Sequence, residues 1–184
     1  MTALDFFSRW RVRLGYFLAI VVLLLARPNP RSILLGAAVG VIGLAIRAYS
    51  AGYLHKQEVL TTTGPYAYTR NPLYFGSSIL AVGAAVAMRS WLAAAVILFY
   101  FAVAYAFVML REEMELRGKH GAAFDAYAAA VPLFFPWLTR KPSPGGSRGA
   151  FSWKQYKRNH EYEAPVGFLL FLILLAVIWR WSGL

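Results

Sequence analysis

The sequence predicts an all-α membrane protein, a polytopic bundle of about five transmembrane helices with an amphipathic helix on the cytoplasmic side. Of its 184 residues, 59% are hydrophobic, and the mean hydropathy is +0.51. A soluble domain is roughly half apolar, so this chain exceeds the usual value. The apolar residues also form long uncharged runs, such as residues 91–110, which would make about 30 Å of helix.

Five apolar runs mark the expected spans. They are residues 14–26, 32–54, 73–88, 91–110 and 166–181. The first span would extend back to Trp10. Only Arg89 and Ser90 separate the third run from the fourth, which predicts a tight helical hairpin. Several runs are short for the hydrocarbon core of a bilayer, so we expect tilt or local thinning.

The distribution of Lys and Arg predicts the orientation of these spans, because positive residues favour the cytoplasmic side. With the N-terminus inside, the inner segments hold Arg9, Arg11, Arg13, Lys56, Arg70, Arg111, Arg117, Lys119, Arg140, Lys141, Arg148, Lys154, Lys157 and Arg158. The outer segments hold Arg27, Arg31, Arg89 and Arg180. The two longest polar segments, 55–72 and 111–165, would then lie on the cytoplasmic face of a bacterial inner membrane.

Composition excludes several classes of function. The net charge of +11 would suit nucleic acid, but the basic residues lie between apolar runs, where membrane topology places them, so we expect no nucleic-acid partner. The chain has no cysteine, which excludes disulfides, Cys-ligated zinc and thiol catalysis. Its three histidines lie in separate segments, without the spacing of metal ligands. We therefore expect no metal site.

We expect one membrane domain over residues 1–184, with a core of motifs at 58–138. Residues 139–150 are rich in Pro, Gly and Ser, which predicts a flexible linker before the last span. Residues 112–130 can form the amphipathic helix. Its apolar positions at i, i+3 and i+7 are Phe124, Tyr127 and Val131.

The polar segment before the third run contains residues that suit a ligand. The Gly-Pro pair at 64–65 and the Asn-Pro pair at 71–72 predict turns, and proline fits the first turn of a helix. The start of that helix would offer N–H groups and partial positive charge to an anion. Arg70 adds a permanent cation. The nearby aromatic residues are Tyr66, Tyr68 and Tyr74. An alternative interpretation is an interfacial turn within an aromatic belt.

Charged residues elsewhere are further candidates. Glu112 and Glu113, with Glu115, follow the fourth run directly. Carboxylates at a helix C-terminus are unfavourable, so these either begin a new helix or bind a cation. Arg47 lies within the second span, where a charge is a functional candidate unless it only snorkels to the interface. Glu161 belongs to a mixed-charge cluster before the last span.

An ordered series of motifs makes the chain resemble the isoprenylcysteine carboxyl methyltransferase family and its wider relatives, the phospholipid N-methyltransferases. The series is Gly64-Pro65-Tyr66-x-Tyr68-x-Arg70-Asn71-Pro72-x-Tyr74-x-Gly76, Glu112-Glu113, Gly121-x-x-Phe124-x-x-Tyr127 and Val131-Pro132-x-x-x-Pro136. The resemblance covers residues 58–138 well and the flanking segments less well. It implies S-adenosyl-L-methionine as the cofactor and a lipophilic, membrane-embedded or lipidated methyl acceptor.

The resemblance also implies roles for individual residues. The cofactor pocket would be lined by Tyr66, Arg70, Asn71, Pro72, Tyr74 and Tyr127. Glu113, with Glu112, would pair the ammonium of the methionine moiety. We expect Arg70, Arg47, Arg111 and Glu161 to be catalytic residues. Arg70 could pair the carboxylate of the cofactor, and an arginine such as Arg47, Arg111 or Arg158 could orient an acceptor carboxylate. Asn71 departs from the best-known members, which have histidine there, so a proton-handling role at this position would be lost.

Carboxyl O-methylation of the isoprenylcysteine type is the leading prediction for the reaction. N-methylation of a phospholipid headgroup is an alternative. An amine must be neutral to attack, so this reaction would require a carboxylate such as Glu161 or Glu163 near the amine. A membrane reductase that uses NADPH is a different enzyme class. A non-enzymatic scaffold is a further reading, since Gly36 and Gly40 form a GxxxG motif that could drive helix packing. The sequence leaves the acceptor, the oligomeric state and the pathway open.

Overall fold

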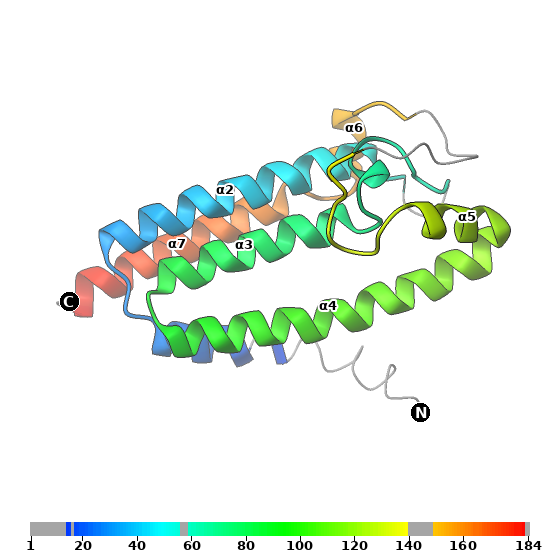
Figure 1. Ribbon diagram of the computed structural model, residues 1–184. Coiled ribbons are helices and arrows are strands. Elements are labelled where there is room, and N and C mark those ends of the chain that lie inside the picture. The colour runs from blue at the N-terminus through cyan, green and yellow to red at the C-terminus, as the bar shows by residue number, and fades with distance from the viewer. Residues whose placement is uncertain (1–13, 16, 56–58, 140–148, 183–184) are drawn as a thin grey trace. The chain divides into compact units, whose positions relative to one another are not determined.

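The computed structural model describes residues 14–15, 17–55, 59–139 and 149–182, and this part of the chain is helical without a strand (Figure 1). Residues 17–25 are helical. They are followed by α2 (Pro30–Tyr53), the short 3-10 helix η1 (Gly64–Ala67), α3 (Pro72–Met88), α4 (Trp91–His120), α5 (Ala122–Ala130), α6 (Trp153–Arg158) and α7 (Glu163–Ser182). Some of the predictions concern residues outside this part of the chain. They are the inner-side positive residues Arg9, Arg11, Arg13 and Lys56, and most of the linker at 139–150.

The helices confirm an integral membrane protein with an all-α fold. Three of them, α2, α4 and α7, are long and apolar enough to cross a membrane. The third expected span is the apolar helix α3, whose 17 residues would reach about 26 Å, slightly less than a hydrocarbon core of about 30 Å. The helix boundaries follow the apolar runs to within a few residues, and Pro72 occupies the first position of α3 as predicted.

Two boundaries differ from the prediction. The fourth span does not end at Leu110, because α4 continues as one helix through the charged residues to His120. The expected amphipathic helix over 112–130 is therefore the end of α4 and a separate α5, divided at Gly121 with φ of 49°. The helix α6, before the last span, was not predicted.

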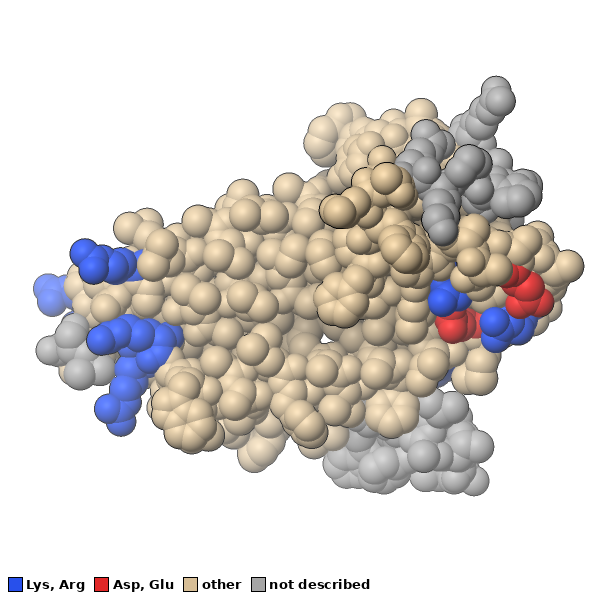
Figure 2. All heavy atoms as spheres, in the orientation of Figure 1, with Lys and Arg blue, Asp and Glu red and all other residues tan. Residues whose placement is uncertain are grey.

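The chain forms two compact units, to which α2, α3 and α4 each contribute residues. Unit 1 comprises residues 1–41, 78–108 and 168–184, and unit 2 comprises residues 42–77 and 109–167. The core of unit 1 consists of Val22, Ala26, Ala87, Met88, Ala93 and Leu175. The charged residues described in unit 1 are four arginines, Arg27, Arg31, Arg89 and Arg180. Figure 2 shows Lys and Arg side chains gathered in one region of unit 1, beside a surface on which no charged side chain is visible.

Small residues bring α2 and α3 into close contact within unit 1. A Cβ added to Gly36 would lie 2.4 Å from the carbonyl oxygen of Gly83, and one added to Gly83 would lie 2.7 Å from the carbonyl oxygen of Gly36. Gly40 faces the ring of Phe168 on α7 in the same way. The GxxxG motif thus packs helices of this bundle against one another.

Unit 2 has its own core and contains most of the predicted motifs. Phe124, Tyr127 and Val131 are buried together, which confirms the apolar face predicted for them. The segment that follows α5 lies against residues 68–71, since Trp137 N donates to the carbonyl of Tyr68 at 2.9 Å. This segment, residues 131–137, is called the strap below.

Candidate functional site

The loop that carries η1 is held rigidly at Tyr66. Its N–H donates to the carbonyl of Thr63 at 3.2 Å, and its own carbonyl accepts a 2.7 Å hydrogen bond from Tyr127 Oη. Tyr66 and Tyr127 are both buried. Two predicted site residues are therefore joined, and the backbone of Tyr66 is held through both its N–H and its carbonyl.

The next residues bind the strap before α3 begins. Arg70 N donates to the carbonyl of Pro132 at 2.9 Å. Asn71 Nδ2 donates to the carbonyl of Leu133 at 2.9 Å. The amide of Asn71 thus holds the backbone of the strap, which is a positional role and needs no proton transfer.

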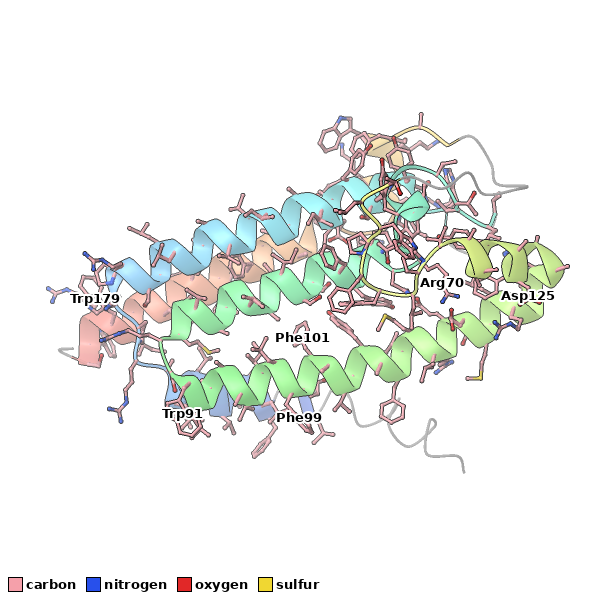
Figure 3. The ribbon with its side chains drawn as sticks, viewed as in Figure 1. Arg70, Trp91, Phe99, Phe101, Asp125 and Trp179 are labelled. Carbon is pink, nitrogen blue, oxygen red and sulfur yellow. The ribbon has the colours of Figure 1, made fainter. Side chains whose placement is uncertain are left out.

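The motif loop and α3 meet α4 through two contacts with neighbouring carboxylates. Arg70 points from its loop toward α4 (Figure 3) and forms an ion pair with Glu113. One turn into α3, Tyr74 Oη donates to Glu112 Oε1 at 2.6 Å. The structure therefore brings together Arg70, Tyr74, Glu112 and Glu113, four of the candidate site residues. It also shows that the charge of Glu113 is already balanced.

Glu112 differs from the other acids in the described part of the chain. Those acids are Glu112, Glu113, Glu115, Asp125, Glu161 and Glu163. Five of them lie within ion-pair distance of an arginine or a histidine. Glu112 has the neutral phenol of Tyr74 as its hydrogen-bond partner. Among the described residues, Glu112 is thus the acid without an ion pair to a basic side chain.

Two buried donors in unit 2 have no hydrogen-bond partner among the described residues. They are Tyr66 Oη and Arg70 Nε. Burial raises the pKa of Tyr66 well above its ordinary value, and Tyr127 and Glu112 add to that rise. Burial likewise raises the pKa of Tyr127, while the positive charge of Arg70 opposes the rise. Both phenols are therefore neutral donors at physiological pH.

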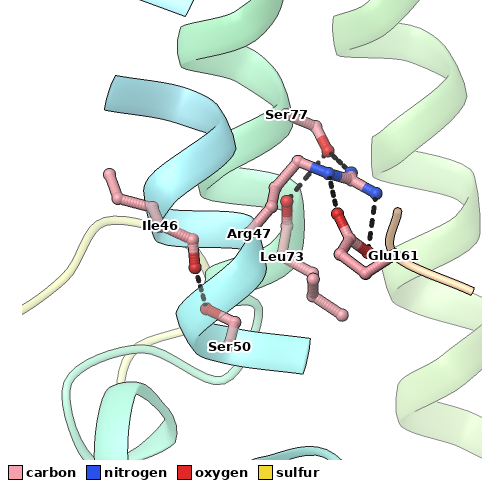
Figure 4. A network of polar contacts seen from close by, with 6 residues as sticks. All are labelled: Ile46, Arg47, Ser50, Leu73, Ser77 and Glu161. Carbon is pink, nitrogen blue, oxygen red and sulfur yellow. Dashed lines mark hydrogen bonds and ion pairs between the residues drawn. The ribbon is translucent and has the colours of Figure 1, made fainter. Parts of the chain in front are cut away.

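A second polar network links α2, α3 and the segment before α7 (Figure 4). Arg47 Nε lies 2.6 Å from Glu161 Oε1, and Arg47 NH2 lies 3.1 Å from Glu161 Oε2. The guanidinium also donates to Ser77 Oγ, which donates to the carbonyl of Leu73 at 2.9 Å. Two residues predicted to act on the acceptor are thus bound to each other.

A glycine of the motif makes room for this network. A Cβ at Gly76 would lie 2.8 Å from Arg47 Cγ and 2.9 Å from the carbonyl oxygen of Gly43. Neither the backbone of α2 nor the arginine stem could remain in place. The absence of a side chain at Gly76 therefore lets the Arg47 side chain and the backbone of α2 lie directly against α3.

Arg111 differs from Arg47 and Arg70 in that its side chain is exposed. It pairs with Glu115 one turn along α4 at 2.8 Å, and the side chains are 56% and 61% exposed. Glu163 is exposed as well and lies 3.8 Å from His160. The structure thus gives Arg111 an exposed ion pair along α4.

Sequence reasoning missed two residues, in α6 and at its C-cap, that donate hydrogen bonds to the carbonyls at the end of α2. Asn159 Nδ2 donates to the carbonyls of Ala51 and Leu54 at 2.8 and 2.9 Å. Gln155 Nε2 donates to the carbonyl of Leu54 at 2.6 Å. The last carbonyls of a helix lack partners within the helix, and here side chains from about a hundred residues later supply the donors. No local pattern marks such contacts.

The fold and these networks define a helical integral membrane protein with a polar cluster built from α2, α3, α4 and the segment before α7. The chain belongs to the phospholipid methyltransferase family, whose model matches residues 32–123. The matched residues include Arg47, Arg70, Glu112 and Glu113, whereas Glu161 and the strap follow them.

Two curated proteins are similar to part of the chain. The nickel-cobalt-cadmium resistance protein NccN of Alcaligenes xylosoxydans xylosoxydans is 35% identical over 108 residues, which cover 58% of this chain and 49% of that protein. The cobalt-zinc-cadmium resistance protein CzcN of Cupriavidus metallidurans is 32% identical over 108 residues, 58% of this chain and 48% of that protein. The chain thus spans about half the length of the curated relatives it matches. No solved structure matches it.

Proposed function

We propose that the protein transfers a methyl group from S-adenosylmethionine to a lipophilic acceptor in the membrane. The observation that carries this proposal is the uncompensated charge of Glu112 beside the neutral pairs Arg70–Glu113 and Arg47–Glu161. These five side chains sum to one negative charge. S-adenosylmethionine has an ammonium, a carboxylate and a sulfonium, and so carries one positive charge. The family supports the same chemistry.

The residues present fit the cofactor. Glu112 would pair the ammonium, which moves the site predicted on Glu113 by one residue. Arg70 Nε, buried without an acceptor, would donate to the ligand while the same guanidinium keeps Glu113 neutralised. When bound, S-adenosylmethionine supplies an electrophilic methyl group on sulfur. The chain would hold the reactants in line in a site with little water, which is the main requirement of such a transfer.

The acceptor predicted from the sequence is a carboxylate of the isoprenylcysteine type, and it remains our first candidate. An arginine would orient it, and Arg47 is the arginine within the second network. N-methylation of a phospholipid headgroup is the second candidate. The pairing of Arg47 with Glu161 and of Arg70 with Glu113 favours it, because the charge of each guanidinium is already balanced by a carboxylate of the chain, whereas a neutral amine needs no cation.

We further propose five spans, with the N-terminus and unit 2 on the cytoplasmic side of a bacterial inner membrane. The helix at residues 17–25 and the short α3 would be the two spans in addition to α2, α4 and α7. The four arginines described in unit 1 would then face the outer side, consistent with the smaller number of positive residues expected there.

One experiment tests the reaction and separates the acceptors. The purified protein is incubated with membrane lipid extract and methyl-labelled S-adenosylmethionine, and labelled lipids are treated with mild alkali. A carboxyl methyl ester releases volatile labelled methanol, whereas an N-methyl group is stable to alkali and stays on the non-volatile headgroup. Absence of any labelled lipid, with confirmed cofactor binding, would contradict a lipid acceptor. The names of the relatives suggest a cellular readout, growth of a deletion strain on nickel, cobalt or cadmium.

A further inference from the structure

The hydroxyl of Tyr66 is a buried donor without an acceptor. Tyr66 is 6% exposed, and no described residue accepts a hydrogen bond from its Oη. Leaving such a group unsatisfied is unfavourable, and native proteins rarely do so without a reason. The neighbouring phenol gives the contrast, because Tyr127 Oη is equally buried and does have an acceptor.

The surroundings of Tyr66 indicate what kind of acceptor would satisfy it. Glu112 and Glu161 lie close enough for their charges to raise the pKa of this phenol. Glu161 is balanced by Arg47, but the charge of Glu112 would repel a simple anion. A ligand that carries a cation directly beside its acceptor oxygen would not be repelled. An α-amino acid group has this arrangement, since its ammonium and carboxylate share one carbon atom.

We propose that Tyr66 Oη donates to the carboxylate of the cofactor's methionine moiety, while Glu112 pairs the adjacent ammonium. The inference rests on the proposed function and adds a residue-level basis for recognising the amino-acid part of the cofactor. It also means that the ligand-free protein keeps an unsatisfied donor in place for its ligand. The backbone of Tyr66 is held by Tyr127 and Thr63.

The test compares Tyr66→Phe with Tyr127→Phe in the full chain, purified in detergent. The first readout is the melting temperature without ligand. Tyr66→Phe removes an unsatisfied hydroxyl and should raise the melting temperature by a few degrees. Tyr127→Phe removes a satisfied hydroxyl, of the same type and burial, and should lower it. A fall in both variants would show that Tyr66 has a partner in the ligand-free protein and would overturn the proposal.

The second readout is calorimetric binding of two probes, S-adenosylhomocysteine and methylthioadenosine, which lacks the amino-acid group. Tyr66→Phe should weaken S-adenosylhomocysteine about tenfold, or about 1.4 kcal/mol, and leave methylthioadenosine unchanged. Equal weakening of both probes would place Tyr66 against the nucleoside and overturn the assignment, while the proposed function would stand. Failure of the parent protein to bind either probe would contradict the proposed function itself, and the inference with it.

Discussion

Arg47 and Glu161 are separated by 114 residues and form a two-pronged ion pair within unit 2, with a nitrogen–oxygen distance of 2.6 Å at the shorter contact. Glu161 is almost fully buried and Arg47 largely so. Charges removed from water require a partner, and loss of one leaves the other uncompensated. The pair therefore joins α2 to the segment before α7, and neither charge can be removed alone without a cost in free energy.

Removal of one member of this pair should be costly. We expect Arg47→Met to lower the free energy of unfolding by about 3–5 kcal/mol, and Arg47→Met with Glu161→Met together to recover much of the loss. Thermal unfolding in detergent measures both. Glu115→Met is the control at an exposed ion pair, because the pair of Glu115 with Arg111 should contribute at most about 1 kcal/mol. Equal effects of Arg47→Met and Glu115→Met would contradict a buried, structural pair.

The two adjacent glutamates of α4 should respond differently to neutralisation. Glu112→Gln should weaken binding of S-adenosylmethionine by about 1.5–3 kcal/mol, the scale of a hydrogen bond to a charged group, without loss of stability. Glu113→Gln should instead destabilise the ligand-free protein, because Arg70 loses its counter-charge. Calorimetry and thermal unfolding on both variants separate these effects. Stronger loss of binding in a fully stable Glu113→Gln protein would return the ammonium site to Glu113.

Asn71→His tests the departure from the best-known family members. The asparagine amide holds the strap through Leu133, and an imidazole N–H can donate to the same carbonyl. We expect the variant to keep activity within about tenfold and to gain no titration between about pH 5 and 8. A pH–rate profile with saturating cofactor measures this. A new, steep limb in the histidine variant would show that the position can handle a proton.

Gly76→Ala should disturb α2 and α3 together. The added Cβ would meet Arg47 Cγ and the carbonyl of Gly43 closer than real Cβ contacts occur, and overpacking of this kind costs about 1–3 kcal/mol. Gly118→Ala is the control, because a Cβ there meets no atom and alanine favours a helix. A Gly76→Ala protein as stable as the parent would mean that α2 and α3 can separate freely at this point.

Single cysteines can establish the orientation, since the chain has none of its own. Gly118→Cys and Trp91→Cys lie at opposite ends of α4, and Trp91 is strongly exposed. An impermeant thiol reagent added to intact cells should label position 91 and spare position 118 until the cells are opened. The reverse pattern would invert the proposed topology.

Much of the fold follows from the sequence because the decisive signals are local. A long uncharged run, with a proline directly before it, placed α3 to within one residue. The spacing of Phe124, Tyr127 and Val131 identified the core of unit 2. The end of α4 was placed too early because a change from apolar to charged residues marks the limit of a membrane span, whereas the helix itself persists until a residue such as Gly121 breaks it.

The sequence indicated which residues are candidates for the site, but not which of them contact one another. Successive residues of a helix point about 100° apart, so the sequence alone could not tell which of Glu112 and Glu113 would meet Arg70. Contacts such as Asn159 with Ala51, or Arg47 with Glu161, join segments more than a hundred residues apart. Such pairings depend on how the helices assemble, for which a single sequence contains no periodic signal.

The hydrogen bonds from α6 to the end of α2 impose an order on biogenesis. A growing polypeptide delivers α2 long before Gln155 and Asn159, so the carbonyls of Ala51 and Leu54 must first be hydrated or held by another factor. Only when residues 149–161 emerge can α2 receive its final donors and Arg47 its counter-charge. A chain stalled or cut before this point would insert its apolar helices and still hold an unfinished unit 2, which gives membrane quality control a clear feature to recognise.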